Sequence, residues 1–240
     1  MSGAWEDWRR ERTAAATAPF GTAALDRTEW LSPEPRALTG LPGTWRVEAG
    51  AVVADGATVG GATLVLAPGQ DAEVAGVRVR AFDRRGSAVR VFDPASAYRT
   101  SIVAIDAYDD DPAWRLTGRF RPASAAAEVD VVAVDGVVSP ARLAGEIDFE
   151  TPEGPATLTV TSTAGGGYSA VLGDATNGDE TYRFRFVDLG RPEGDAFTVD
   201  FNRLHLPPCA FSPEYVCPTP LPGNRWTIPV RAGERNVIRG

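Results

Sequence analysis

The residues best suited to chemistry lie near the C-terminus, where a polar strand end comes shortly before two cysteines. Asp200 and Asn202 alternate with apolar residues, so a strand here places a carboxylate and a carboxamide on one face. Such groups serve acid-base catalysis or bind a polar ligand. We therefore expect a pocket beside Asp200 and Asn202. In the alternative, Asp200 pairs with an arginine such as Arg185 or Arg203, and Asn202 caps a turn.

A proline-rich segment, residues 206–220, follows and contains both cysteines of the chain, Cys209 and Cys217. Its prolines disfavour regular structure and fix an extended path, so we interpret it as a rigid strap. Because a reducing cytoplasm keeps thiols reduced, two buried thiols are favoured over a disulfide. Metal binding and catalysis by a cysteine stay open as alternatives.

A second polar run, residues 173–182, leads into an aromatic stretch that carries Tyr182 and Arg185. Pockets in β folds often open where polar strand ends meet loops, so we place this run beside the strap in one hypothetical site. Its candidate catalytic residues are Asp200, Asn202, Arg185, Tyr182 and Cys209, and its candidate ligand-binding residues are Arg203, Asp174, Glu180 and Arg90.

Metal and cofactor motifs are weak or missing. The single histidine, His205, could join Cys209 and Cys217 as zinc ligands or form a Cys–His pair, but the short cysteine knuckle and the fourth ligand of a structural zinc site are lacking. Nucleotide, phosphate and serine-hydrolase fingerprints are also lacking. Residues 109–111 are three aspartates, which favour a solvated acidic turn over a calcium loop. We expect no metal and no cofactor.

Charge and hydropathy restrict the kinds of binding partner that we expect. The net charge is −8, and all 24 basic residues are arginines, mostly interleaved with carboxylates, which argues against a nucleic-acid partner. No apolar run approaches the roughly 18 residues of a membrane helix, and the N-terminus lacks a signal-peptide pattern. We expect a cytoplasmic protein with a small-molecule ligand and no membrane partner. The composition suggests a bacterial, actinobacterium-like source, and the oligomeric state stays open.

Hydrophobic periodicity predicts the elements that position these residues. Residues 2–18 suit a short amphipathic helix that Pro19 ends, with Trp5 and Trp8 packed on the main body. From residue 43 onward the apolar residues alternate, as in strands, with glycine turns between them. In the stretch 182–186, the aromatic residues alternate with Arg183 and Arg185.

The expected fold is therefore all-β and mainly antiparallel, a β-sandwich or barrel of about ten to thirteen strands. No long helix follows Thr28, which disfavours βαβ units and a nucleotide-binding parallel sheet. We expect a single domain over residues 1–240, with the helix at 2–18, the β body at 43–201, and the proline-rich strap and tail at 202–240.

Residues across nearly the whole chain follow one pattern. The most specific are 200–203, Pro207 to Phe211, Cys217, Pro218, Asn224 and 232–234; weaker matches are Trp8, Arg9, Trp30, Leu31, 42–45, Arg85, Gly86, Arg90, Asp93, Pro94, 174–182 and Arg185. The pattern resembles a bacterial family, domain-of-unknown-function family 1684. The resemblance implies no activity, because the family has none assigned. It implies that the strap has a common role, and that His205, where similar sequences are generally apolar or aromatic, has none shared by the family.

These observations lead to three functional hypotheses. The first is a small-molecule-handling β protein, in its strongest form an enzyme that catalyses hydrolysis, isomerisation or cyclisation beside Asp200 and Asn202. The second is a non-catalytic ligand-binding module. The third is a protein-interaction module that uses the tryptophan helix or the strap.

Overall fold

The computed structural model describes residues 2–58, 60–190 and 194–240, and the chain forms two compact units. We call residues 12–102 the N-terminal unit, and residues 1–11 with 103–240 the C-terminal unit. Nearly all strand pairs are antiparallel, which confirms the expected all-β class. Whether the two units behave as one domain stays a prediction. Among the described helices, none has the length and hydropathy needed to cross a membrane.

The N-terminal unit contains two four-stranded sheets, in the orders β1-β8-β7-β6 and β2-β3-β4-β5. Both sheets contribute to one apolar core, in which Trp45 and Val79 are fully buried, so the unit is a small sandwich. Its elements are η1 (Thr22–Ala24), β1 (Leu25–Trp30), β2 (Arg36–Leu38), β3 (Leu41–Glu48), β4 (Ala51–Asp55), β5 (Leu64–Leu66), β6 (Asp71–Val74), β7 (Val77–Asp83), β8 (Ser87–Phe92) and α2 (Ala97–Thr100).

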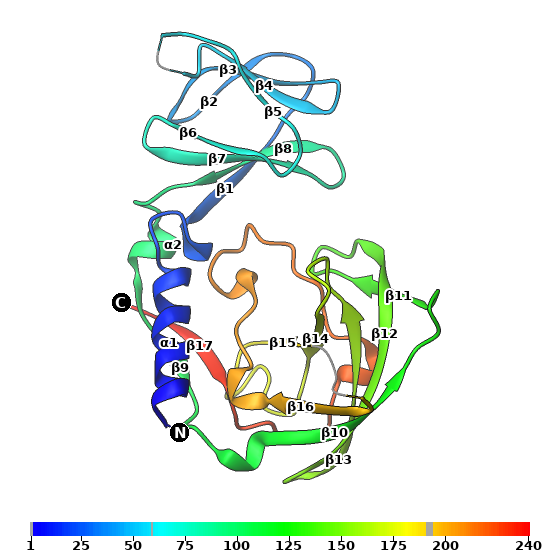
Figure 1. Cartoon of the computed structure of the whole chain (residues 1–240). Coiled ribbons are helices and arrows are strands. Elements are labelled where there is room, and N and C mark those ends of the chain that lie inside the picture. Colours follow the sequence, from blue (N-terminus) through cyan, green and yellow to red (C-terminus); the bar gives the residue numbers. More distant parts are fainter. Residues whose placement is uncertain (1, 59, 191–193) are drawn as a thin grey trace. The chain divides into compact units, whose positions relative to one another are not determined.

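The C-terminal unit is built on a seven-stranded sheet of order β15-β14-β13-β12-β10-β16, with β11 also paired to β12. The sheet curls into a half-barrel (Figure 1), and a separate pair joins β9 and β17. Its elements are β9 (Ile102–Ala107), η2 (Pro112–Trp114), β10 (Arg115–Pro122), β11 (Glu128–Val132), β12 (Val138–Thr151), β13 (Gly154–Ser162), β14 (Tyr168–Leu172), β15 (Arg185–Leu189), β16 (Ala196–Asp200), η3 (Phe201–Arg203), η4 (Pro208–Ala210), η5 (Pro222–Asn224) and β17 (Glu234–Arg239).

The long strand β12 carries the bend of this sheet. Its first part pairs with β11 and its second with β10, and its register on β13 shifts between Leu143 and Gly145. Gly145 has φ +155°, and an added Cβ would lie 2.4 Å from the Arg121 carbonyl oxygen. Only glycine fits this crossing without strain, so the bend depends on the absence of a side chain there.

The alternation expected in β12 and β13 is confirmed, because Ile147, Phe149, Leu158 and Val160 are all buried in the core of the C-terminal unit. The expectation for residues 182–186 is wrong. The strand there is β15 and begins only at Arg185, whose fully buried side chain shares the inner face with Val187 and Leu189. The alternation gave the wrong result because an arginine in a strand is normally assigned to the solvent-facing side, and Arg185 is buried.

The N-terminal helix α1 (Ser2–Ala16) ends three residues before Pro19. Within the C-terminal unit, its Trp5 indole donates a hydrogen bond to the Asn202 carbonyl oxygen at 3.3 Å, and Arg9 donates to the Ile105 carbonyl oxygen at 2.7 Å. The expected docking of this helix is thus confirmed for Trp5. The described residues contain 17 strands, more than expected, because short ones such as β2 and β5 show too little alternation to be predicted.

A segment near the C-terminus inserts where β13 and β14 separate. These two strands pair only at Thr161–Ser169 and Ser162–Tyr168. Beyond that point the Asn224 carboxamide accepts from the Thr159 amide at 2.7 Å and donates to the Thr159 carbonyl oxygen at 2.8 Å. One buried side chain therefore supplies the two hydrogen bonds that a neighbouring strand would make.

We predict that Asn224→Ala destabilises the chain by about 1–3 kcal/mol, because it leaves the Thr159 backbone groups without their partner. Urea denaturation followed by tryptophan fluorescence measures the loss. Asn236→Ala is the matched control, since that half-buried carboxamide donates one bond, to Glu180. Equal losses in the two variants would contradict the strand-replacing role.

Candidate functional site

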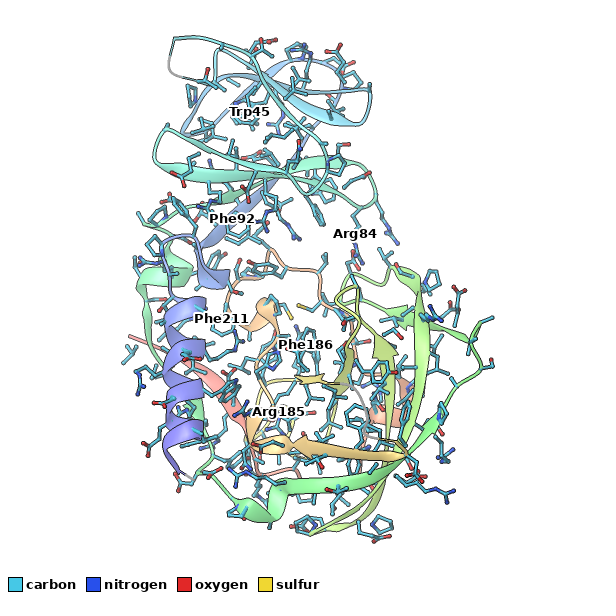
Figure 2. The ribbon with its side chains drawn as sticks, in the orientation of Figure 1. Trp45, Arg84, Phe92, Arg185, Phe186 and Phe211 are labelled. Atoms are coloured by element: carbon cyan, nitrogen blue, oxygen red, sulfur yellow. The ribbon has the colours of Figure 1, made fainter. Side chains whose placement is uncertain are left out.

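Arg185, labelled in Figure 2, belongs to a buried polar cluster. Its guanidinium pairs with Asp174 at 2.7 Å, and both side chains are fully buried. It also donates to the carbonyl oxygens of Val230, Ala232 and Glu234. Since these partners surround the guanidinium and exclude solvent, the geometry favours a structural role for Arg185 and Asp174 over ligand binding.

Asn202 is also fully buried, and its carboxamide joins distant parts of the chain. It accepts from the Asp111 amide at 3.0 Å and donates to the Asp111 carbonyl oxygen at 2.9 Å. Asp200 accepts from the Asn202 backbone amide and lies 3.5 Å from Arg115 and 3.6 Å from Arg203. The two residues expected to line a pocket therefore bind each other and the acidic turn at 109–111, as in the structural alternative.

Glu180 belongs to a separate surface cluster. Its carboxylate pairs with Arg231 at 2.8 Å and accepts from the Tyr108 hydroxyl at 2.8 Å. The hydrogen bond from Arg231, with that from Tyr108, lowers the pKa of Glu180 to about 2. Burial, together with the bond to Glu180, raises the pKa of Tyr108 to about 12. Arg90 belongs to the N-terminal unit, where its guanidinium lies 3.7 Å from the centre of the Phe82 ring.

The structure does bring Tyr182 and Cys209 together. The Tyr182 hydroxyl donates to the Cys209 carbonyl oxygen at 3.0 Å and lies 3.6 Å from the Cys209 sulfur. Arg183 donates to the same hydroxyl at 3.1 Å, and the Cys209 amide donates to the Cys217 sulfur at 3.3 Å. Both cysteines are free thiols. We call Tyr182, Arg183, Cys209 and Cys217 the thiol cluster.

The electrostatics of the thiol cluster favour ionisation of one sulfur. The hydrogen bond from Cys217 is the largest influence on Cys209, and the Tyr182 hydroxyl and the Arg183 charge act in the same direction. Together they outweigh burial and lower the pKa of Cys209 to about 7. Burial raises the pKa of Tyr182, which therefore stays a hydroxyl donor at neutral pH.

The contacts of His205 described here are with residues outside the thiol cluster. Its backbone exchanges two hydrogen bonds with Phe186, and its ring Nε2 lies 3.8 Å from the Asp188 carboxylate. Within residues 2–58, 60–190 and 194–240, no group of three or more His, Cys, Asp or Glu side chains is arranged to hold a metal ion.

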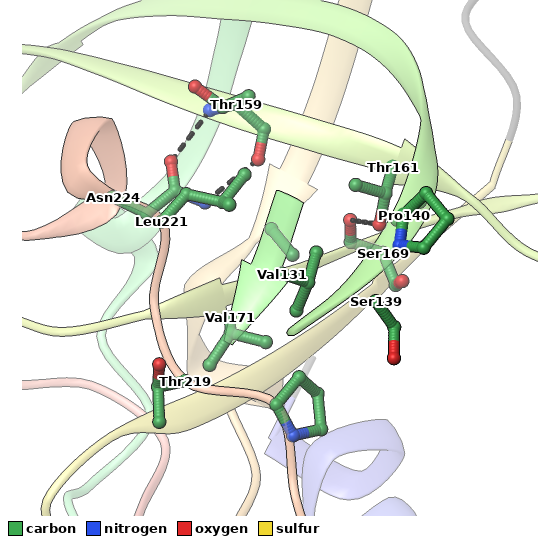
Figure 3. Close-up of a pocket in the computed structure, with 13 residues that line it drawn as sticks. Val131, Ser139, Pro140, Thr159, Thr161, Ser169, Val171, Thr219, Leu221 and Asn224 are labelled. Atoms are coloured by element: carbon green, nitrogen blue, oxygen red, sulfur yellow. Dashed lines mark hydrogen bonds between the residues drawn. The ribbon is translucent and has the colours of Figure 1, made fainter. Parts of the chain in front are cut away.

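A cavity of about 270 Å³ lies against the half-barrel sheet, between β11, β12, β13, β14 and the end of the strap. We call it the sheet cavity (Figure 3). No charged side chain is among its lining residues. They are Val131, Ser139, Pro140, Ala141, Thr159, Thr161, Ser169, Ala170, Val171, Pro218, Thr219, Leu221 and Asn224.

Comparison with known proteins identifies the family of this chain. The sequence profile described as "Protein of unknown function (DUF1684)" matches residues 100–235, more than half of the chain. The chain belongs to the DUF1684 family. The match covers most of the C-terminal unit and leaves out the weaker parts of the pattern before residue 100.

Among solved structures, the DUF1684 chain is similar to an uncharacterised protein of Haloarcula marismortui known from solution NMR. The two share 23% identity over 55% of this chain and 75% of that one, with a TM-score of 0.45. Among curated proteins there is no match.

The sequence reasoning did not single out the sheet cavity of this DUF1684 protein or the contribution of Arg183. The cavity had a visible signal, because Thr159 and Thr161 alternate with the buried Leu158 and Val160 and so mark the opposite face of β13. Arg183 had none. Its role depends on the hydroxyl of the residue before it and on a cysteine 26 positions later.

We predict that Arg185→Met destabilises this DUF1684 chain by about 3–5 kcal/mol, because it leaves Asp174 buried without its cation. Arg203→Met is the control; its half-exposed ion pair with Asp200 predicts a change below about 1 kcal/mol. Chemical denaturation measures both. If the Arg185→Met chain were as stable as wild type, the cluster would not be structural. The hypothesis that Arg185 is a catalytic residue would then be favoured again.

Proposed function

We propose that the protein binds a small, uncharged and largely apolar molecule in the sheet cavity. The observation that supports this most directly is the cavity's lining, which is apolar apart from a few hydroxyls and one carboxamide. Ligand sites usually combine an apolar wall with a small number of polar groups that orient the ligand. The volume of about 270 Å³ lies near the lower end of the usual range of roughly 300–1,000 Å³, which favours a compact ligand.

The polar groups of the cavity restrict the ligand further. The Asn224 carboxamide is committed to Thr159, the Thr161 hydroxyl donates to the Ser169 carbonyl oxygen, and the Thr219 hydroxyl donates to the Val132 carbonyl oxygen. A charged ligand would lose its hydration without gaining an ionic partner from these walls. A neutral molecule with one or two hydrogen-bonding atoms is the better fit.

The proposed binding site is the sheet cavity at the C-terminal end of the strap, and not the pocket that the sequence predicted beside Asp200 and Asn202. The side chains of Asp200 and Asn202 are engaged in internal contacts, whereas Pro218 and Thr219 line a cavity. A carrier or sensor function needs binding alone. The sheet cavity contains no carboxylate, imidazole or thiol among its lining residues to act as catalyst, so the binding module is favoured over the enzyme. Two free thiols also suit the reducing cytoplasm in which we place the protein.

Val131→Trp tests the proposal by filling the cavity from β11. We expect the wild-type chain to bind 1-aminoanthracene, a small neutral fluorophore, with enhanced emission, and Val131→Trp to weaken binding about tenfold or more, because the indole occupies the ligand's volume. The matched control is Val132→Trp on the same strand, since Val132 is 45% exposed and does not line the cavity.

Fluorescence titration and thermal shift give two readouts for the three proteins. Equal affinity of the two variants for the fluorophore would place its binding elsewhere. No binding by the folded wild-type chain, followed by no thermal shift with a set of compact neutral metabolites, would overturn the proposal.

A further inference from the structure

Two anchors hold the cysteines of the strap at fixed positions. Next to Cys209, the Phe211 amide donates to the Pro208 carbonyl oxygen, closing η4, and Arg239 donates to the Phe211 carbonyl oxygen at 2.7 Å. Phe211 is fully buried. Next to Cys217, the Val134 amide donates to the Cys217 carbonyl oxygen at 2.9 Å. The strap thus brings the two thiols together as part of the fold.

The two cysteines are in contact. The Cys209 amide donates to the Cys217 sulfur at 3.3 Å, and Cys217 is the largest influence on the pKa of the Cys209 thiol. Two cysteines this close can form a disulfide when the side-chain geometry permits. The chain contains no other cysteine, so a disulfide within one chain can join only Cys209 and Cys217.

The two cysteines differ in exposure, since Cys209 is half-buried and Cys217 is 4% exposed. The groups that act on the Cys209 sulfur are the Cys217 thiol, the Tyr182 hydroxyl and the Arg183 guanidinium, and all three favour its thiolate. We therefore expect a solvent-borne reagent to react at Cys209 before Cys217.

We propose that Cys209 and Cys217 form a hydroperoxide-reactive site, in which Cys209 is the attacking residue and Cys217 the resolving residue. The proposal is independent of ligand binding in the sheet cavity, because neither cysteine is among the residues that line it. It assigns to Tyr182 and Arg183 a positioning role, since both act on the Cys209 sulfur and do not themselves react.

The reaction has two balanced steps. The Cys209 thiolate attacks the terminal oxygen of a small hydroperoxide; the S–O bond forms, the O–O bond breaks, and the leaving alkoxide takes a proton from water to become an alcohol, or water when the oxidant is hydrogen peroxide. The hydroxide left by that water balances the proton released when Cys209 ionised. The Cys217 sulfur then attacks the Cys209 sulfenic acid; the S–S bond forms, the S–O bond breaks, and the hydroxyl leaves as water with the Cys217 proton. Two electrons pass from the thiols to the peroxide.

The test uses the full-length chain, reduced and then treated with hydrogen peroxide at neutral pH. We expect both thiols to disappear together, the intact mass to fall by two hydrogens, and dithiothreitol to restore them. We expect Cys217→Ser to form a dimedone adduct at Cys209, because no thiol resolves the sulfenic acid, and Cys209→Ser to stay largely unlabelled. Oxidation mainly to intermolecular dimers, or equal labelling of the two variants, would overturn the assignment.

The pH dependence of iodoacetamide alkylation separates the positioning role of Tyr182 from a structural one. In the Cys217→Ser chain, where serine keeps a hydroxyl donor, we expect the alkylation rate to rise with pH through a midpoint below that of the same chain unfolded in urea, since only the thiolate reacts and Tyr182 and Arg183 still favour it. Adding Tyr182→Phe removes a donor to the sulfur and shifts the midpoint upward, toward the ordinary thiol value.

Tyr108→Phe is the control for this shift, because its hydroxyl binds Glu180 instead of a thiol. At pH 7 we expect the native Cys217→Ser chain to react severalfold faster than the same chain unfolded in urea, because Tyr182 and Arg183 increase the fraction of Cys209 that is thiolate. An unchanged midpoint in the Tyr182→Phe chain, or native alkylation no faster than in urea, would contradict the proposal.

Discussion

The C-terminal unit depends on the burial of one charge. The desolvation of the Arg185 guanidinium costs several kcal/mol, and the acceptors around its two terminal nitrogens offset this cost. Asp174 supplies one acceptor, and the carbonyl oxygens of residues 230, 232 and 234 supply the others. An arginine is suited to this position because its planar guanidinium can reach several acceptors at once. The path of the chain before β17 is thereby fixed.

That fixed path determines the start of the strap. Glu234 is almost fully buried, and its carboxylate accepts from the Leu206 amide at 2.6 Å. Gly233 passes so close to Leu204 that an added Cβ would lie 2.5 Å from the Leu204 carbonyl oxygen. The strap therefore starts from a rigid platform. Its backbone contacts with Val132, the last residue of β11, and with Val134 just after it hold the strap between the thiol cluster and the sheet cavity.

Local sequence pattern predicted the faces of the long strands and did not predict the contacts of the candidate site. Alternation correctly gave the inward faces of β12 and β13, because side-chain direction in a strand is set by neighbouring residues. It predicted that Arg185 faces solvent, because a charged residue in an alternating strand usually does. Here the charge is instead paired with the buried Asp174. The contact of Asn202 with Asp111 spans 91 positions, and no local signal carries such a distance. Tyr182 and Cys209 were both expected in one hypothetical site, but the contact between them depends on tertiary structure and has no local signal.

The carboxamide of Asn224 has a consequence for solubility. Where β13 parts from β14, its backbone would present a free edge, and free edges recruit strands from other molecules. Asn224 covers that edge at Thr159, and the Trp226 indole donates to the Thr157 carbonyl oxygen at 2.8 Å, covering the next accessible carbonyl on the same side. Two side chains thus protect the open side of a curled sheet against edge-to-edge aggregation, a task that a closed barrel accomplishes with an additional strand.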